Sequence, residues 1–209
     1  FNGWAGEGVS DPSSASTTVL MDQNRSVSAS FSLNSYALTL STGTGGTVTG
    51  EGNFSHGTLT AISATPDSGY SFNGWVGEGV SDPGSLSTTV LMDQNRSVSA
   101  TFSLNAYELT LLAGAGGSVT GEGNFSHDTL TAISATPDNG YSFSGWSGEG
   151  VSNPSSLSTT VLMDQNRSVS ASFSLNAYAL TLITGTGGTV TGEGNFSHGF
   201  LAPISATPN

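Results

Sequence analysis

The chain has 209 residues and a net charge of −12, from 15 acidic residues against three arginines, and it contains no cysteine and no lysine. These numbers exclude disulfides, cysteine-based metal sites and lysine–asparagine isopeptide cross-links. The three arginines are never clustered, which excludes nucleic acid as a partner and argues against an anionic membrane surface. No apolar run approaches the roughly 20 residues of a membrane span, so membrane insertion is not expected.

A motif rich in glycine and aromatic residues recurs along the chain. It is complete at residues 70–80, and its tryptophan returns at a fixed spacing of 71 residues, at Trp4, Trp75 and Trp146. A fixed period in this range is typical of a repeat array. The period predicts the back part of a repeat at residues 1–35, complete repeats at 36–106 and 107–177, and the front part of a repeat at 178–209.

Within the first complete repeat, apolar and small polar residues alternate as in half-buried strands. We expect strands at residues 36–40, 47–49, 58–64, 70–75, 87–92 and 97–104. The alternation slips between Leu59 and Ile62, which predicts a bulge or bend. Residues 66–69 predict a turn, and residues 93–96 a hairpin turn. No segment shows helical spacing, so the sequence predicts an all-β array of small modules with about six strands each.

The aromatic residues of the motif are the expected core anchors. A buried aromatic side chain contributes more apolar area than an aliphatic neighbour in a small core. We therefore expect Trp75 and Phe72 to cluster with Phe102, Val98 and Leu91. The corresponding anchors in the other copies are Trp4, Trp146 and Phe143. The alternative is that the tryptophan is exposed and stacks on a sugar, because glycine-rich loops beside a tryptophan also suit carbohydrate binding.

Four sequence blocks carry a family resemblance. They are Tyr-x-Leu-Thr-Leu from Tyr36, Gly-Gly-Thr-Val-Thr-Gly from Gly45, Ala-Thr-Pro-Asp-x-Gly-Tyr-x-Phe-x-Gly-Trp from Ala64, and Met-Asp-x-Asn-x-Ser-Val-x-Ala-x-Phe from Met92. In this order they resemble the divergent InlB B-repeat family of bacterial surface proteins. The resemblance implies small β-rich modules, β-grasp-like or small sandwiches, strung along large secreted or cell-surface proteins. It implies no enzymatic activity.

The residues that carry chemistry are sparse. His56, His127 and His198 are the only bases of the kind that nucleophilic catalysis needs, one in each repeat, so we expect no enzyme and no catalytic residue. No cofactor is expected either. Calcium is the one metal left open, because Glu78, Asp82 and Asp93 with nearby carbonyls offer oxygen ligands, although no EF-hand spacing is present. The alternative for these three acids is a solvated loop.

Each repeat also contains two Asn-x-Ser sequons, with an acidic residue two positions before the asparagine. They offer candidate glycosylation sites, and the alternative is that asparagine is simply what a tight turn favours. The candidate asparagines are Asn24, Asn95, Asn166, Asn53, Asn124 and Asn195.

Two functions from different classes follow from these features. The first is a non-catalytic structural segment of a large secreted or cell-surface bacterial protein, forming an extracellular filament or adhesin stalk. The second is a module that binds a host or surface glycan, or the cell wall, through many repeated sites. The burial of Trp75 discriminates between them, because only an exposed indole can stack on a sugar.

The two partial repeats suggest a partner for the chain. Residues 1–35 carry the back strands of a module and residues 178–209 carry the front strands, so the chain looks like a piece of something longer. We expect copies to join head to tail along a fibre, which is the geometry that gives an open filament. Trp4 would then be buried against residues 178–209 of a neighbouring copy.

Overall fold

The computed structural model describes residues 1–209, and its regular structure consists of β-strands, which confirms the all-β prediction. It divides into two compact units, Phe1–Ser103 and Leu104–Asn209, which are described separately. The strands that begin in the first unit are β1 (Gly3–Ala5), β2 (Ser28–Ser30), β3 (Ser35–Thr42), β4 (Gly46–Thr49), β5 (Gly52–Ser55), β6 (Thr58–Pro66), β7 (Tyr70–Val76), β8 (Ser87–Met92) and β9 (Arg96–Leu104). Those of the second are β10 (Ala106–Ala113), β11 (Gly117–Thr120), β12 (Gly123–Ser126), β13 (Thr129–Pro137), β14 (Tyr141–Ser147), β15 (Ser158–Met163), β16 (Arg167–Leu175), β17 (Ala177–Leu180), β18 (Gly188–Thr191), β19 (Gly194–Ser197) and β20 (Ser205–Pro208). The structure contains no helix that could span a membrane.

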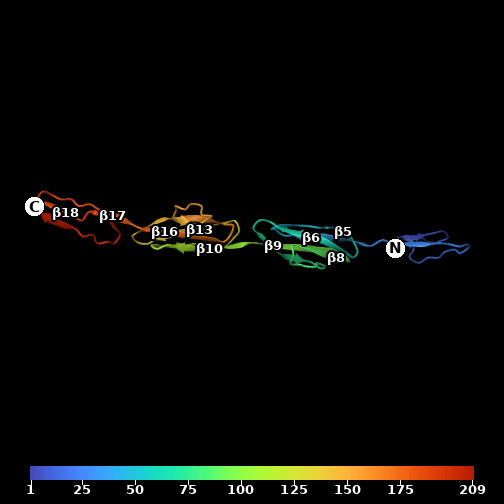
Figure 1. Ribbon diagram of the computed structural model, residues 1–209. Helices are drawn as coiled ribbons and strands as arrows, with labels where there is room; N and C mark the ends of the chain where they lie inside the picture. The colour runs from blue at the N-terminus through green and yellow to red at the C-terminus, as the bar shows by residue number, and fades with distance from the viewer. The chain divides into compact units, whose positions relative to one another are not determined.

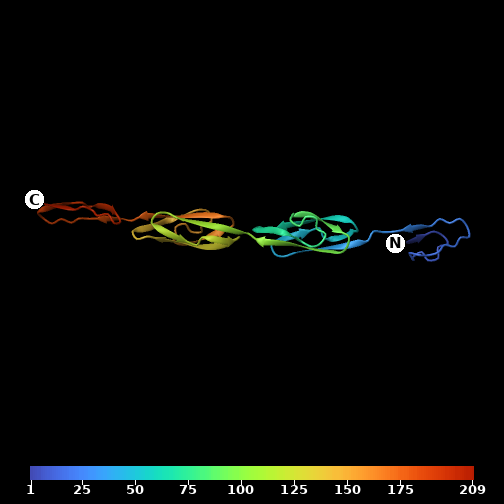
Figure 2. The same cartoon turned by 90° about the horizontal axis from the view of Figure 1, so that it is seen from below.

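Strands β3 to β9 form one two-sheet sandwich, the first sandwich, and strands β10 to β16 form the second sandwich (Figure 1). The larger sheet has the order β5-β3-β9-β7 in the first sandwich and β12-β10-β16-β14 in the second. The smaller sheet has the order β4-β6-β8 and β11-β13-β15. Figure 2 shows the same strands from a direction at 90° to that of Figure 1. The pairing of β3 with β9 is parallel, as is that of β10 with β16. Of the two folds that the sequence left open, this is the sandwich.

The core of each sandwich lies between its two sheets. Residues that point inward alternate with residues that point outward along every long strand, as the pleat of a β-strand requires. In the first sandwich the buried hydrophobic residues are Leu38, Leu40, Trp75, Val98 and Ala100 from the larger sheet and Ile62, Ala64, Val90 and Met92 from the smaller sheet. In the second sandwich they are Leu109, Leu111, Trp146, Val169 and Ala171, with Ile133, Ala135, Val161 and Met163.

The first sandwich has one strand more than the sequence predicted. The additional strand is β5, an edge strand that pairs antiparallel with β3 and places Phe54 opposite Tyr36. Its sequence, Gly-Asn-Phe-Ser, has a single apolar residue, so it shows no alternation that could identify a strand. It becomes a strand because β3 offers it an edge to pair with.

The predicted hairpin at residues 93–96 is wrong. Strand β8 lies in the smaller sheet and β9 in the larger sheet, so the short segment between them crosses from one layer of the sandwich to the other. Both strands bury one face, and packing those faces against each other satisfies both. A hairpin would have placed the two strands side by side in one sheet.

Of the bulge or bend predicted in β6, the bulge is wrong. Strand β6 pairs with β8 in unbroken register from Thr58 to Ser63. The alternation of apolar and polar residues is interrupted here because Thr60 points into the core and is 6% exposed, whereas Leu59 points outward and is 62% exposed. A bulge does occur in the second sandwich, between Phe143 and Gly145 in the pairing of β14 with β16.

The expected core cluster is correct for most of its members and wrong for Leu91. Phe72 and Phe102 pack against the cluster that contains Trp75 and Val98. Leu91 is 39% exposed, whereas its neighbour Met92 is fully buried. Because Val90 faces inward, the period of two along β8 brings Met92 to the same face and turns Leu91 to solvent.

The remaining residues of each unit form only two-stranded sheets. Residues 1–35 contain β1 paired with β2, and residues 177–209 contain β17 paired with β19 and β18 paired with β20. We call residues 1–35 the back half and residues 178–209 the front half. Apolar residues that are buried in the sandwiches are half-buried or exposed in the halves, because each half contains only some of the strands of a sandwich.

Replacing Trp75 by alanine is expected to lower the free energy of unfolding of the first sandwich by about 3–5 kcal/mol, because it removes a large buried side chain and leaves a cavity. Differential scanning calorimetry should show one transition moved to lower temperature, with the second sandwich as an internal reference. Leu59→Ala, on the outer face of β6, is the control and should change stability by less than about 0.5 kcal/mol. An unchanged melting profile for Trp75→Ala would contradict the assignment.

Replacing Thr60 by valine is expected to raise the free energy of unfolding by about 1 kcal/mol. The Thr60 hydroxyl is buried without a hydrogen-bond partner, and removing such a group relieves its desolvation penalty. The matched control is Thr65→Val in the same strand, where the side chain is exposed. Urea titration measures the free energy of unfolding of both variants. Equal changes for Thr60→Val and Thr65→Val would show that the buried hydroxyl is not a source of instability.

Candidate functional site

The loop after each tryptophan folds around the indole. The backbone N–H of Trp75 donates to the Pro83 carbonyl at 2.8 Å, and the indole Nε1–H donates to the Ser85 carbonyl at 2.9 Å. The same pair of bonds is made by Trp4 and by Trp146. Trp75 is 4% exposed and Trp146 is 6% exposed, so both side chains lie in the core and are almost entirely covered.

The other aromatic anchors surround the tryptophan. The rings of Phe72 and Trp75 lie 5.7 Å apart between centroids, as do those of Phe143 and Trp146. The tilted and edge-on arrangements are those that aromatic pairs favour. Phe1 and Trp4 make the corresponding contact at 5.6 Å, although Trp4 is only half-buried.

An arginine in each repeat holds two carboxylates in place. Arg96 Nη1 contacts Glu78 Oε2 at 3.0 Å and Nη2 contacts Asp93 Oδ1 at 2.7 Å. The arginine side chain is 10% exposed, whereas that of Glu78 is 86% exposed. Gly79 lies against the guanidinium, because an added Cβ there would lie 3.1 Å from Nε. Arg25 and Arg167 make the same two ion pairs. In the two sandwiches the arginine thereby ties the loop after the tryptophan to the crossover between sheets.

The acids considered for calcium have other partners. Glu78 and Asp93 bind the arginine, and Asp82 Oδ1 accepts a hydrogen bond from the Gly84 amide at 3.0 Å. In the back half, hydrogen bonds from the Ser13 side chain and amide lower the pKa of Asp11, the counterpart of Asp82. No group of three or more histidine, aspartate or glutamate side chains is placed to hold a metal ion.

The two sequon asparagines of a repeat occupy different environments. Asn95 Oδ1 accepts a hydrogen bond from the Ala37 amide at 2.9 Å, and Asn166 Oδ1 does the same for Glu108. These asparagines therefore join the crossover between sheets to the first strand of the sandwich. The other set lies exposed on edge strands, at Asn53, Asn124 and Asn195. Glycosylation of either set stays a prediction.

The three histidines lie beside tyrosines. The ring centroids are 5.9 Å apart for Tyr36 and His56 and 6.1 Å apart for Tyr178 and His198. No ion pair joins any of the histidines to a carboxylate. The arrangement does not contain the oriented base that a nucleophilic site needs.

Within the second unit, one residue connects the second sandwich to the front half. Asn176 is the single residue between β16 and β17. Its amide donates to the Gly140 carbonyl at 2.8 Å, its Oδ1 accepts from the Ser142 hydroxyl at 2.6 Å, and its carbonyl accepts from the His198 amide at 2.8 Å. We call Gly140, Ser142, Asn176 and His198 the junction cluster.

The His198 ring fills the space above Gly140. A Cβ added to Gly140 would lie 2.0 Å from His198 Cδ2, and Gly140 has a φ of 83°. Only glycine therefore fits, on grounds of both space and backbone conformation. Sequence reasoning weighed His198 only as a catalytic base and missed this role. The short connection between repeats was the one feature that could have indicated this role. It places the histidine of one repeat near the turn before the aromatic strand of the previous repeat.

The fold and the period define a tandem array of small β-sandwich modules. The family model of the divergent InlB B-repeat domain matches residues 1–35, 36–106, 107–177 and 178–209. The chain belongs to this family, which confirms the resemblance seen in the sequence. No curated protein and no solved structure matches the chain. The family is one of bacterial surface-protein repeats, which indicates a structural repeat at the cell surface or outside the cell, of a kind that is typically non-catalytic.

Replacing Gly140 by alanine is expected to open the junction cluster. Hydrogen exchange of the Asn176 amide should accelerate at least tenfold, because the new Cβ displaces His198 and the bond to the Gly140 carbonyl. Gly57→Ala is the matched control, since Gly57 has the same φ of 83° but no atom within 4 Å of an added Cβ. The control has the same backbone strain, about 1–2 kcal/mol, without the clash. Equal exchange of Asn176 in the two variants would contradict the packing role of His198.

Proposed function

We propose that this chain is a non-catalytic structural segment of a large secreted or cell-surface bacterial protein, in which tandem sandwiches build an extracellular filament or an adhesin stalk. We further propose that each repeat of about 71 residues is one module. The family, whose members are bacterial surface-protein repeats, supports both the location and the structural role.

The junction cluster is the observation that carries this proposal. Flexible linkers between domains are usually several residues long and rich in glycine and serine. Here a single asparagine connects β16 to β17, and its amide, side chain and carbonyl are all hydrogen-bonded. Such a connection restricts the motion of one module against the next, as a stalk requires.

The chain also suits exposure to proteases. Trypsin-like enzymes cut after lysine and arginine, and the chain has only Arg25, Arg96 and Arg167. Their side chains are 9–11% exposed and held by two carboxylates each. Cleavage would require local unfolding, because the arginine has to leave its partners to enter a protease site.

A multivalent glycan-binding module is the rival function. It would need an exposed aromatic ring, but the indoles of Trp75 and Trp146 lie in the cores of the sandwiches. The half-buried Trp4 uses its Nε1 on the Ser14 carbonyl. The tryptophans that suggested this function therefore favour the structural one.

Immunogold electron microscopy of intact producing cells tests the proposal. Antibody against this segment is expected to label the outside of the cells or fibres that extend from them. A second strain carries a tag on the terminal domain farthest from the cell and extra repeats inserted between that domain and the cell. The distance between the tag and the membrane should increase, because each module adds length.

An antibody against a cytoplasmic protein is the control for cell integrity. Label confined to the cell interior would overturn the proposed location. A tag whose distance does not change with the number of repeats would overturn the stalk.

A further inference from the structure

The chain enters and leaves each complete sandwich through the two strands that pair in parallel. In the second sandwich the first strand, β10, pairs with the last strand, β16, over Leu109–Ala113. In the first sandwich β3 pairs with β9 over Leu38–Thr42 in the same way. Tension carried along the chain therefore acts on a sandwich at the start of its first strand and at the end of its last strand.

Tension at these two points shears the parallel pair. Parallel strands run in the same direction, so the start of one strand and the end of the other lie at opposite ends of the pair. Pulling these points apart slides one strand along the other and loads all the hydrogen bonds between them together. A hairpin pulled at its two ends opens instead one bond at a time. Forced unfolding is governed by the rate of unfolding, and shear makes the barrier depend on the whole row of bonds.

The row of bonds that resists sliding extends along β10. The Glu108 amide donates to Asn166 Oδ1 at 2.9 Å, and the Gly114 amide donates to the Ala171 carbonyl at 2.8 Å. Backbone amides point alternately to the two sides of a strand, so the alternate amides between residues 108 and 114 also face β16. Every second residue of this stretch thus contributes a bond that must stretch when the strands slide.

The asparagine of the crossover adds a bond to this row. Asn166 lies just before β16, and its side chain bonds to β10 ahead of the backbone pairing, which begins at Leu109. Asn95 does the same in the first sandwich, where its Oδ1 accepts from the Ala37 amide at 2.9 Å. The bonded amide lies near the point where the chain enters the sandwich. The asparagine therefore reinforces the end of the row that tension on the first strand loads first.

The inner face of the parallel pair is closed to water. Leu109 and Leu111 of β10, with Val169 and Ala171 of β16, face the core and are at most 6% exposed. The two strands are also the central pair of the larger sheet, between β12 and β14. Water cannot reach the bonds from the core side to replace them, and hydrogen bonds are stronger in surroundings of low dielectric constant.

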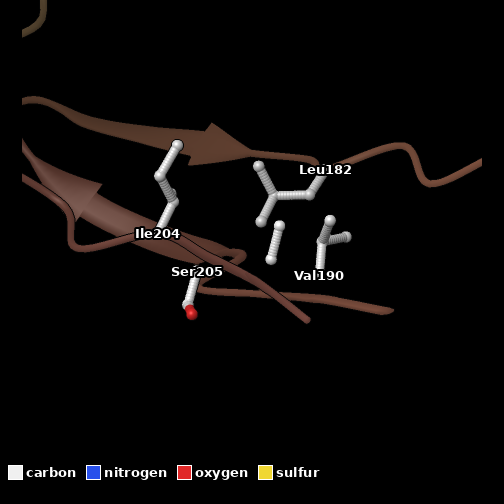
Figure 3. Close-up of a pocket in the computed structure, with 5 residues that line it drawn as sticks. Leu182, Val190, Ile204 and Ser205 are labelled. Carbon is white, nitrogen blue, oxygen red and sulfur yellow. The ribbon is translucent and has the colours of Figure 1, made fainter. Parts of the chain in front are cut away.

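The front half shows the first strand without its parallel partner. It contains β17, the counterpart of β10, but no counterpart of β16. Strand β17 ends at Leu180, where the parallel pairing would begin, and Leu182 borders an open cavity with Val190 and Ile204 (Figure 3). In a complete sandwich the second part of the first strand is therefore held in its sheet by the parallel pair.

We propose that the parallel pair of each sandwich, together with its crossover asparagine, is a mechanical clamp that keeps the module folded when the array is pulled along its length. The inference deepens the proposed function and rests on it, since a stalk or filament carries tension. A second sandwich that unfolded would release the 70 residues of Ala106–Leu175, which span up to about 250 Å when extended. The clamp thus fixes the length of the stalk as well as the fold of the module.

Optical tweezers with two attachment geometries test the clamp on the full chain. The chain has no native cysteine, so cysteines at exposed positions define where the force acts. Ala106→Cys with Ser174→Cys pulls the clamp in shear, whereas Ala106→Cys with Gln165→Cys pulls the starts of both strands apart and unzips it. At one pulling rate, the unfolding force is expected to be at least about twofold higher in shear, because all bonds are loaded together.

A pair of asparagine variants separates the clamp from the other contacts of the sandwich. In the shear geometry, Asn166→Ala should speed unfolding at constant force about fivefold, because it removes one hydrogen bond of the row. Asn124→Ala, exposed on the edge strand β12, is the control and should leave the rate unchanged. Equal forces in the two geometries, or equal rates for the two variants, would overturn the inference. Neither result bears on the surface location, which immunogold labelling tests separately.

Discussion

The parallel pairing of the first and last long strands closes each sandwich, and the rest of the structure depends on it. Strands β3 and β9 come from opposite ends of a repeat, and Asn95 bonds to the amide of Ala37 across a separation of 58 residues. Only this pairing brings the front strands and the back strands of a repeat into one larger sheet. Where it is missing, as in the two halves, long strands shorten and core residues are exposed to water.

Small modules of this size have little core to stabilise them, because a chain of about 60 residues buries only about 60% of its unfolded surface. This chain has no disulfide to compensate. It uses instead a fully buried methionine and tryptophan at the centre, an arginine that joins the loop to the crossover, and a junction that uses the backbone of the preceding module. Each device is local to one repeat or to its neighbour, as expected for an array whose stability depends on nearest-neighbour contacts.

The same geometry explains why the residues that suggested chemistry are structural. The indole of Trp75 is enclosed by its own loop, and Glu78 and Asp93 are bound to Arg96. His198 packs on a glycine of the preceding turn. Residue types that catalyse reactions or bind ligands in other proteins here satisfy hydrogen bonds and fill space at the loops and joints of a sandwich.

The period, the all-β class, the family and most of the strands could be predicted from the sequence, because they follow from local patterns: the 71-residue spacing, the alternation of apolar residues, and turn residues such as Gly69. The sequence also marked Trp75 and Val98 as interior, since aromatic and β-branched residues on an alternating strand have one buried face. The sheet that each strand joins could not be predicted in this way, because it depends on contacts between strands that are distant in the chain. The crossover between β8 and β9, the inward direction of Thr60 and the edge strand β5 all depend on partners far away in the chain. The junction cluster was invisible for the same reason: the packing of His198 on Gly140 is a contact between repeats, and a pattern within one repeat contains no information about what lies beside it.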